Sequence, residues 1–186
     1  MDGATGHAAP APCPLRRRIR GIDMEITKKA VTETNTPEET FALGKKIGQK
    51  SISGQVYTLI GDLGVGKTVF TQGFAEGLGV DGPVNSPTFT ILQVYEEGRI
   101  PFYHFDVYRI SDVEEMEEIG YEDCFYGNGV CLIEWANLIE EILPEQYYRV
   151  TIEKNLEKGF DYRRITIESI FPTAVYTVGT CNPGKS

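Results

Sequence analysis

A glycine-rich segment at residues 61–68, GDLGVGKT, matches the pattern G-x-x-x-x-G-K-[ST] of a phosphate-binding loop in full. Glycines let the backbone turn so that successive N–H groups face one anion, and side chains there would block that approach. Lys67 supplies a mobile positive charge for the β- and γ-phosphates of a nucleotide, and the Thr68 hydroxyl suits a Mg²⁺ position. The segment predicts a site for a nucleoside triphosphate and Mg²⁺, with nucleotide contacts from Leu63, Gly64, Val65, Gly66, Lys67, Thr68 and Val69.

The residues that flank this loop predict a strand before it and a helix after it, the setting that a phosphate-binding loop needs. An apolar run at residues 55–60 precedes it and indicates a buried strand, while a helix is expected to run from Lys67 to the terminating Gly79. Phe70, Phe74 and Leu78 share one face of that helix. The loop therefore opens onto a helix N-terminus, whose free N–H groups favour an anion. We expect the loop to face solvent, and a chance glycine-rich turn is the alternative interpretation.

Two acidic residues end other apolar runs and are candidates to complete the site. Phosphoryl chemistry needs a carboxylate near the metal, commonly at the end of a neighbouring buried strand. Glu134 follows the apolar run 130–133 directly, and Asp106 ends the run 102–105. For each acid, a solvated strand-end position is the alternative. His104 alternates with apolar residues, and we interpret it as a structural imidazole rather than as a base.

The periodicity along the chain predicts an α/β fold. Thr36 and Glu39 form a capping box for a helix that runs to about residue 49 and carries Phe41, Leu43 and Ile47 inward. A second capping box, at Ser111, opens an acidic helix that ends at residue 120. Strands are expected at residues 25–31, 55–60, 89–95, 100–108, 130–133, 148–152 and 164–170, and a short helix through Leu138 and Ile142.

Strands and helices alternate early in the chain, whereas hairpins dominate later, which indicates a sheet that is part parallel and part antiparallel. Residues 24–172 are expected to form one domain with the P-loop NTPase-like three-layer architecture. We interpret residues 1–23 as a disordered extension and residues 173–186 as an irregular tail. The four cysteines match no metal template and no CxxC pair, which is typical of reduced cytosolic thiols.

Charge narrows the class of partner. The 186 residues carry a net charge of −9; the first 20 hold four Arg against one Asp, so the remainder carries −12. Because Lys and Arg supply most non-specific affinity for nucleic acid, such a body is a poor autonomous binder of RNA. No apolar stretch has the roughly 18–20 residues needed to cross a bilayer. If RNA is involved, a partner is expected to hold it.

Four motifs recur in an order and spacing that resemble the TsaE (YjeE) family, the ATPase component of bacterial tRNA threonylcarbamoyladenosine (t6A) biosynthesis. They are GDLGVGKT at residues 61–68, SPTFT at 86–90, HFDVYR at 104–109 and IEW at 133–135. The resemblance covers roughly residues 33–152. It implies a cytoplasmic P-loop ATPase that works with a Kae1-like carbamoyltransferase subunit and its paralogous dimerisation partner, reaching tRNA only through them and requiring no membrane.

The resemblance also implies roles for individual residues. It assigns catalytic roles to Lys67, Asp106 and Glu134, with ATP as the nucleotide and Mg²⁺ held by Thr68 and Glu134. Trp135 matches the aromatic residue beside the nucleotide, and the segment 86–90 resembles a loop that responds to the γ-phosphate. One departure is Ala136, where the family often has Pro.

Two other functions share this loop and stay open. A small-molecule kinase usually adds an Arg-bearing lid, and past Arg109 the chain offers only Arg149, Arg163 and Arg164, all in the late strand region. A non-hydrolysing nucleotide switch would use ATP only to change partner binding. We expect a weak ATPase completed by its partners, because the sequence shows no evident base or arginine finger of its own.

Overall fold

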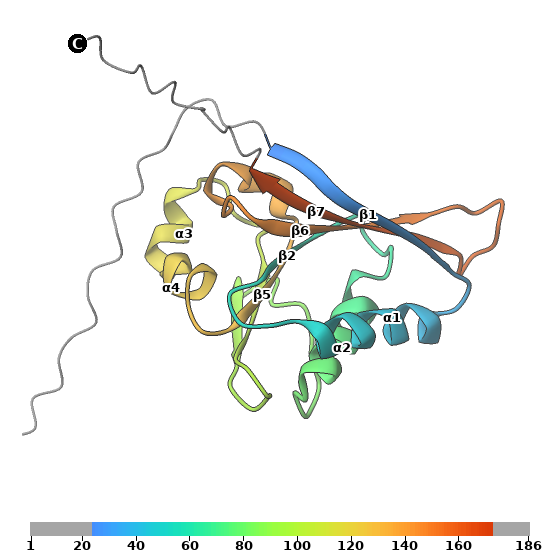
Figure 1. Ribbon diagram of the computed structural model, residues 1–186, viewed down its shortest axis with the longest axis horizontal. Coiled ribbons are helices and arrows are strands. Elements are labelled where there is room, and N and C mark those ends of the chain that lie inside the picture. The colour runs from blue at the N-terminus through green and yellow to red at the C-terminus, as the bar shows by residue number, and fades with distance from the viewer. Residues whose placement is uncertain (1–23, 173–186) are drawn as a thin grey trace, which may run out of the picture.

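The computed structural model describes residues 24–172, whose strands form one seven-stranded sheet in the order β1-β7-β6-β2-β5-β4-β3 (Figure 1). The central strands β6, β2, β5 and β4 run parallel, while β7, β1 and β3 add antiparallel edges. The predicted mixed sheet is confirmed. The expectations for residues 1–23 and 173–186 lie outside the described residues. The strands are β1 (Met24–Thr34), β2 (Val56–Ile60), β3 (Leu92–Tyr95), β4 (Phe102–Asp106), β5 (Val130–Glu134), β6 (Tyr147–Lys154) and β7 (Arg163–Pro172).

Helices cover both faces of this sheet, which gives the three layers expected from the sequence (Figure 1). The buried strand β5 shows how: Val130 and Leu132 pack in one apolar cluster with α2, whereas Cys131 and Ile133 pack in a second cluster with α3 and α4. A strand covered on both faces is apolar throughout. The helices are α1 (Pro37–Lys50), α2 (Lys67–Leu78), α3 (Glu114–Ile119) and α4 (Tyr121–Phe125), with 3₁₀ turns η1 (Ala136–Leu138) and η2 (Glu140–Ile142).

The two long helices, α1 and α2, begin and end close to the predicted residues. Thr36 caps α1 by accepting the N–H of Glu39, and Gly79 ends α2 in the left-handed conformation at φ 81°. Phe70, Phe74 and Leu78 are fully buried, as their spacing predicted. Helix α2 is therefore held against the sheet by one apolar face. This packing fixes the position of its N-terminus, which follows the loop at the end of β2.

The inward face of α1 is confirmed in part. Leu43 and Ile47 pack against the apolar core as predicted, although they and Phe41 are only partly buried. The buried residues of α1 are Thr40, Gly44 and Gly48. The reason is a glycine seam, formed by Gly44 and Gly48 of α1 with Gly73 and Gly77 of α2, where the two backbones touch. A Cβ added at Gly44 or Gly73 would lie 2.2 or 2.0 Å from a backbone oxygen of the opposite helix. Small residues here bring the helices together more closely than apolar side chains would allow.

Three local predictions are corrected by the structure. Ser111 does not cap a helix: α3 begins at Glu114, and the Glu115 carboxylate accepts the N–H groups of Ser111 and Asp112 instead. Residues 89–91 precede β3 in a turn, with Ile91 at φ 65°. The helix expected through Leu138 and Ile142 is the pair of 3₁₀ turns η1 and η2. Within residues 24–172, no helix is both long enough and apolar enough to cross a membrane.

Candidate functional site

The phosphate-binding loop joins the carboxyl end of β2 to the first residue of α2. Gly64 and Gly66 adopt left-handed φ angles of 70° and 104°, a conformation that residues with a Cβ rarely adopt. Arg163, at the start of β7, holds the loop from outside, since its Nε donates to the carbonyl oxygen of Val65 at 2.6 Å. The loop is therefore shaped by its glycines and fixed by a contact from the far end of the domain's sequence.

The loop faces solvent as expected, with Leu63 84% exposed, but Lys67 lies inside the loop and is only 6% exposed. Its Nζ donates to the carbonyl oxygens of Gly61 and Asp62 at 2.8 and 3.0 Å. Burial lowers the pKa of Lys67 below its ordinary value, while Glu134, Asp106 and Asp62 oppose that shift. The ammonium is thus partly desolvated and surrounded by acceptors, a position from which a phosphate can attract it.

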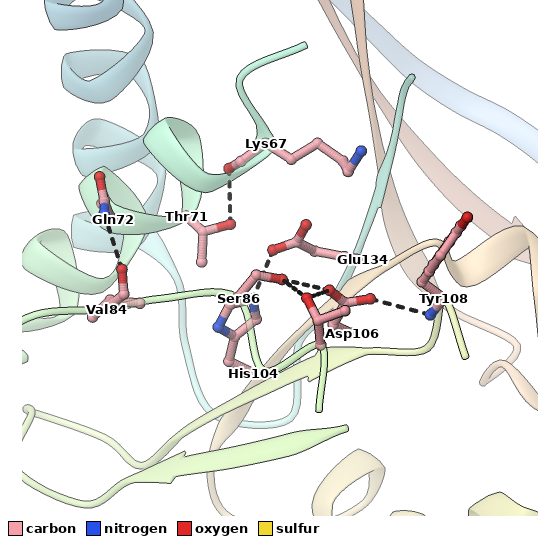
Figure 2. Close-up of polar contacts among 10 residues, drawn as sticks. Lys67, Thr71, Gln72, Val84, Ser86, His104, Asp106, Tyr108 and Glu134 are labelled. Atoms are coloured by element: carbon pink, nitrogen blue, oxygen red, sulfur yellow. Dashed lines mark hydrogen bonds and ion pairs between the residues drawn. The ribbon is translucent and has the colours of Figure 1, made fainter. Parts of the chain in front are cut away.

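Asp106 ends β4 and is only 3% exposed. Its Oδ2 accepts hydrogen bonds from the hydroxyls of Ser86 and Thr88, at 2.5 and 2.8 Å, and its Oδ1 accepts the N–H of Tyr108 at 3.1 Å (Figure 2). The segment that carries Ser86 and Thr88 is thereby tied to the acid. A ligand that drew Asp106 toward itself would pull on this segment too.

Glu134 ends β5 and is 2% exposed. Its Oε1 lies 2.9 Å from Nε2 of the fully buried His104 (Figure 2). Glu134 stands opposite Leu59 of β2 on one side and opposite Asp106 of β4 on the other, all in parallel register. Because parallel strands end at one edge of a sheet, both acids emerge beside the phosphate-binding loop, where ligands of open α/β sheets bind.

These side chains surround one cleft of about 260 Å³. All the predicted site residues line it except Val65 and Val69, which instead border a separate cavity of about 40 Å³ with Pro37 and Thr40 of α1. The structure thus brings the loop, the two acids and Trp135 together. The cleft is lined by Leu63, Gly64, Gly66, Lys67, Thr68, Ser86, Thr88, Asp106, Tyr108, Glu134 and Trp135.

Trp135 forms one wall of the cleft in a strained conformation. Its φ of 62° is left-handed, which is rare for a residue with a side chain and tends to occur at functional sites. Nζ of Lys67 lies 4.0 Å from the centre of the indole ring, and the centre of the Tyr108 ring lies 5.0 Å from it. The cation and the aromatic face attract each other. A nucleotide that recruited Lys67 would change the surroundings of the indole.

Other residues of the site went unrecognised in the sequence. Arg163 has no local signal, because it lies 98 residues after the Val65 carbonyl that it holds. Tyr108 belongs to the HFDVYR motif, but nothing in its position indicates a role. His104 lies two residues from Asp106 on one strand, and this spacing is a signal that both side chains share a face.

The oxygen donors of the cleft suit Mg²⁺, which prefers one or two carboxylates together with substrate phosphates and water. The Thr68 hydroxyl and the Glu134 carboxylate both line it. No group of three or more His, Cys, Asp or Glu among residues 24–172 is arranged to hold a metal by itself. A metal at this cleft would therefore take some of its ligands from the protein and the others from a bound nucleotide.

A parallel core strand that runs into a glycine-rich loop and a helix N-terminus, with acids at the neighbouring strand ends, defines a P-loop nucleotide-binding protein. The sequence model of one family within that class, described as "Threonylcarbamoyl adenosine biosynthesis protein TsaE", matches residues 34–165. The chain belongs to the TsaE family.

Its relatives carry the same description. The chain is 49% identical over 143 residues to the tRNA threonylcarbamoyladenosine biosynthesis protein TsaE of Bacillus subtilis, covering 77% of this chain and 87% of that protein. It is 44% identical to the protein of that name from Treponema pallidum, covering 64% and 86%. The crystal structure of Bacillus subtilis YdiB superposes with a TM-score of 0.66 at 44% identity, over 76% of this chain and 86% of that one.

Proposed function

We propose that this protein is a Mg²⁺-dependent ATPase, converting ATP and water to ADP and phosphate, and that residues 24–172 are its ATPase domain. The observation that carries the proposal is that Lys67, Asp106 and Glu134 line one cleft at the carboxyl edge of the parallel strands. In P-loop enzymes, catalysis consists largely of positioning the phosphates and neutralising their charge. This cleft holds a cation for the phosphates and carboxylates for the metal and the water.

Each residue takes a distinct part in this proposal. Lys67 exchanges its two loop carbonyls for the β- and γ-phosphate oxygens, and the N–H groups at the start of α2 bind the same phosphates. Thr68 and Glu134 hold Mg²⁺, which when bound offsets charge on the phosphates. Asp106, fixed by three hydrogen bonds, orients the attacking water. Trp135 lies beside the nucleotide.

We further propose that the ATPase serves t6A biosynthesis on tRNA. Family membership supports this role, because the relatives from Bacillus subtilis and Treponema pallidum are named for it. A net charge of −9 disfavours binding of tRNA by this chain alone, because Lys and Arg supply most non-specific affinity for nucleic acid. The proposal therefore includes partners that hold the tRNA, the Kae1-like carbamoyltransferase subunit and its paralogous dimerisation partner. The proposal places the protein in the cytoplasm, as the family resemblance implies.

Phosphate release by the full-length chain tests this function, measured with ATP and Mg²⁺ in the presence and absence of the two partner subunits. Lys67→Ala removes the loop cation, and Lys45→Ala removes an exposed cation that pairs with Glu76 at 2.5 Å. We expect release by the natural chain and by Lys45→Ala, and none by Lys67→Ala. Equal release by Lys67→Ala would overturn the assignment of the site.

The same assay separates the two alternatives. Phosphate that appeared on a small-molecule acceptor instead of in solution would make the protein a kinase. One of the arginines that a kinase lid could use is engaged elsewhere, since the Arg163 guanidinium donates to the carbonyls of Val65, Phe160 and Tyr162, and this supports hydrolysis. Partner binding that depended on ATP without any phosphate release would identify a switch.

A further inference from the structure

His104 lies directly behind the carboxylate that is proposed to hold the metal. The imidazole is fully buried on β4, two residues before Asp106 and on the same face of the strand. Its ring stacks on Phe102 with an interplanar angle of 10°. It does not line the cleft. The side chain therefore touches no ligand, and its polar contact is Nε2 to Oε1 of Glu134 at 2.9 Å.

The hydrogen bonding of His104 favours one tautomer. Nδ1 is buried and has no hydrogen-bond partner within residues 24–172. A neutral imidazole carries one N–H, and the other nitrogen is an acceptor. An ionised carboxylate can only accept hydrogen bonds, so Nε2 carries the proton and donates a hydrogen bond to Glu134. The opposite tautomer would bury an unpaired N–H at Nδ1 and place two acceptors against each other, which is unfavourable on both counts.

We propose that His104 is a positioning residue: its Nε2–H holds Oε1 of Glu134 so that the other oxygen, Oε2, is presented to Mg²⁺. The contact with His104 engages Oε1 of Glu134, which leaves Oε2 as the oxygen that this bond does not occupy. Carboxylates that bind metals are in turn held by hydrogen bonds, and loss of such a partner typically lowers metal affinity about 10–100-fold. This inference rests on the proposed function, because it assigns the reason for a buried histidine behind the proposed metal ligand.

A matched pair of substitutions tests the hydrogen bond separately from the packing. In His104→Gln the side-chain amide nitrogen replaces Nε2, whereas in His104→Asn the amide nitrogen replaces only Nδ1. The measurement is nucleotide affinity with and without Mg²⁺, followed through Trp135, which is the one tryptophan of the chain. We expect the Mg²⁺ concentration at half-saturation to rise about 10–100-fold in His104→Asn and to stay within a few-fold of the natural value in His104→Gln.

Affinity for nucleotide without Mg²⁺ is the internal control, and we expect it to be unchanged in both variants. Equal Mg²⁺ dependence in the natural chain and both variants would overturn the positioning role. An equal loss with and without Mg²⁺ would overturn it too, since that pattern means general damage to the cleft. If the natural chain bound nucleotide with no dependence on Mg²⁺, that result would contradict the proposed function itself. If binding depended on Mg²⁺ but both His104 variants behaved like the natural chain, that result would contradict this inference alone.

Imidazole ¹⁵N spectra of the natural chain decide the point even if the Asn variant does not fold. The chain has two histidines, His7 and His104, so His7→Gln assigns the spectrum. We expect His104 to carry its proton on Nε2, and its ring signals to move when Mg²⁺ and ADP are added together but not with ADP alone. A proton on Nδ1, or signals indifferent to Mg²⁺, would overturn the proposal.

Discussion

Asp106 and Glu134 stand directly opposite each other on the parallel strands β4 and β5, yet different partners hold their carboxylates. Asp106 is bound by the hydroxyls of Ser86 and Thr88, which belong to a loop, whereas Glu134 is bound by His104, which belongs to the strand beside it. Asp106 is therefore anchored to a segment outside the sheet, whereas Glu134 is anchored to the interior of the sheet. This difference predicts that the acids are not interchangeable.

Replacing the acid of β4 should separate nucleotide binding from turnover. In Asp106→Asn the side chain keeps its size but loses the charge that orients water. We expect nucleotide affinity within about twofold of the natural chain and a fall in turnover of roughly 10²-fold or more, the scale of lost general-base catalysis. Asp81→Asn, in an exposed loop, removes the same charge and serves as control. Phosphate release with the partner subunits is the readout, and natural turnover in Asp106→Asn would show that the charge of this acid takes no part in hydrolysis.

Replacing the acid of β5 should instead impair metal-dependent binding. Glu134→Gln preserves the shape and can still accept from His104, but it offers Mg²⁺ a neutral oxygen. We expect the affinity for Mg²⁺ and ATP together to fall at least about tenfold while the affinity for ATP alone changes little. Calorimetric titrations with and without Mg²⁺ check this, with the exposed Glu153→Gln as the control. A parallel loss under both conditions would argue against a role in holding the metal.

The glycine seam should be intolerant of a single methyl group. Ala stabilises a helix relative to Gly by about 1 kcal/mol, so Gly73→Ala would be stabilising at an open position of α2. Here the added Cβ would lie 2.0 Å from the carbonyl oxygen of Phe41. We expect a net destabilisation of about 2–3 kcal/mol, since overpacking outweighs propensity. Thermal unfolding measures it, with Gln49→Ala on the exposed side of α1 as control; an unchanged melting temperature would show that the helices separate easily.

Tyr57 should make the domain sensitive to alkali. Burial raises the pKa of Tyr57 to about 12, although the hydrogen bond that Ser51 donates to the phenol oxygen opposes this shift. Between pH 10 and 12 the unfolded chain ionises this phenol while the folded chain keeps it protonated. The stabilising contribution is therefore complete below pH 10 and is lost as the pH rises toward 12, by up to about 2–3 kcal/mol.

A comparison with Tyr57→Phe isolates this effect from the other tyrosines. The difference in free energy of unfolding between the natural chain and the variant should shrink or reverse over pH 10–12 and stay constant from pH 7 to 9. Denaturant unfolding at each pH provides the values. A difference that did not vary with pH would mean that the phenol ionises equally readily in both states.

Local pattern predicted the parts of this fold that depend on neighbours in sequence. The cap at Thr36, the stop at Gly79 and the apolar face of α2 are one-element properties, and the structure has them where the sequence placed them. The capping box at Ser111 failed because Glu115, one residue further on, accepts its N–H instead. Local patterns compete, and packing decides among them.

The contacts that build the site are of another kind. The position of both acids at the carboxyl edge followed from where their strands end, and the structure has them there, while their roles stay predictions. Arg163 binds the Val65 carbonyl of the phosphate-binding loop, 98 positions away in the sequence. Ser86 binds Asp106, which is 20 positions away. No periodicity records such pairs, because they depend on how the sheet is ordered. Apolar periodicity does not indicate the glycine seam, because Gly has no apolar side chain that would identify the buried face of a helix.

A crystal structure of the full chain with Mg²⁺ and a non-hydrolysable ATP analogue tests the central claim most directly. We predict the triphosphate on the loop at residues 61–68, with Nζ of Lys67 moved from the carbonyls of Gly61 and Asp62 to the phosphate oxygens. Mg²⁺ should lie between the phosphates, the Thr68 hydroxyl and Glu134. An analogue bound elsewhere, or a metal held without Thr68 and Glu134, would contradict the account.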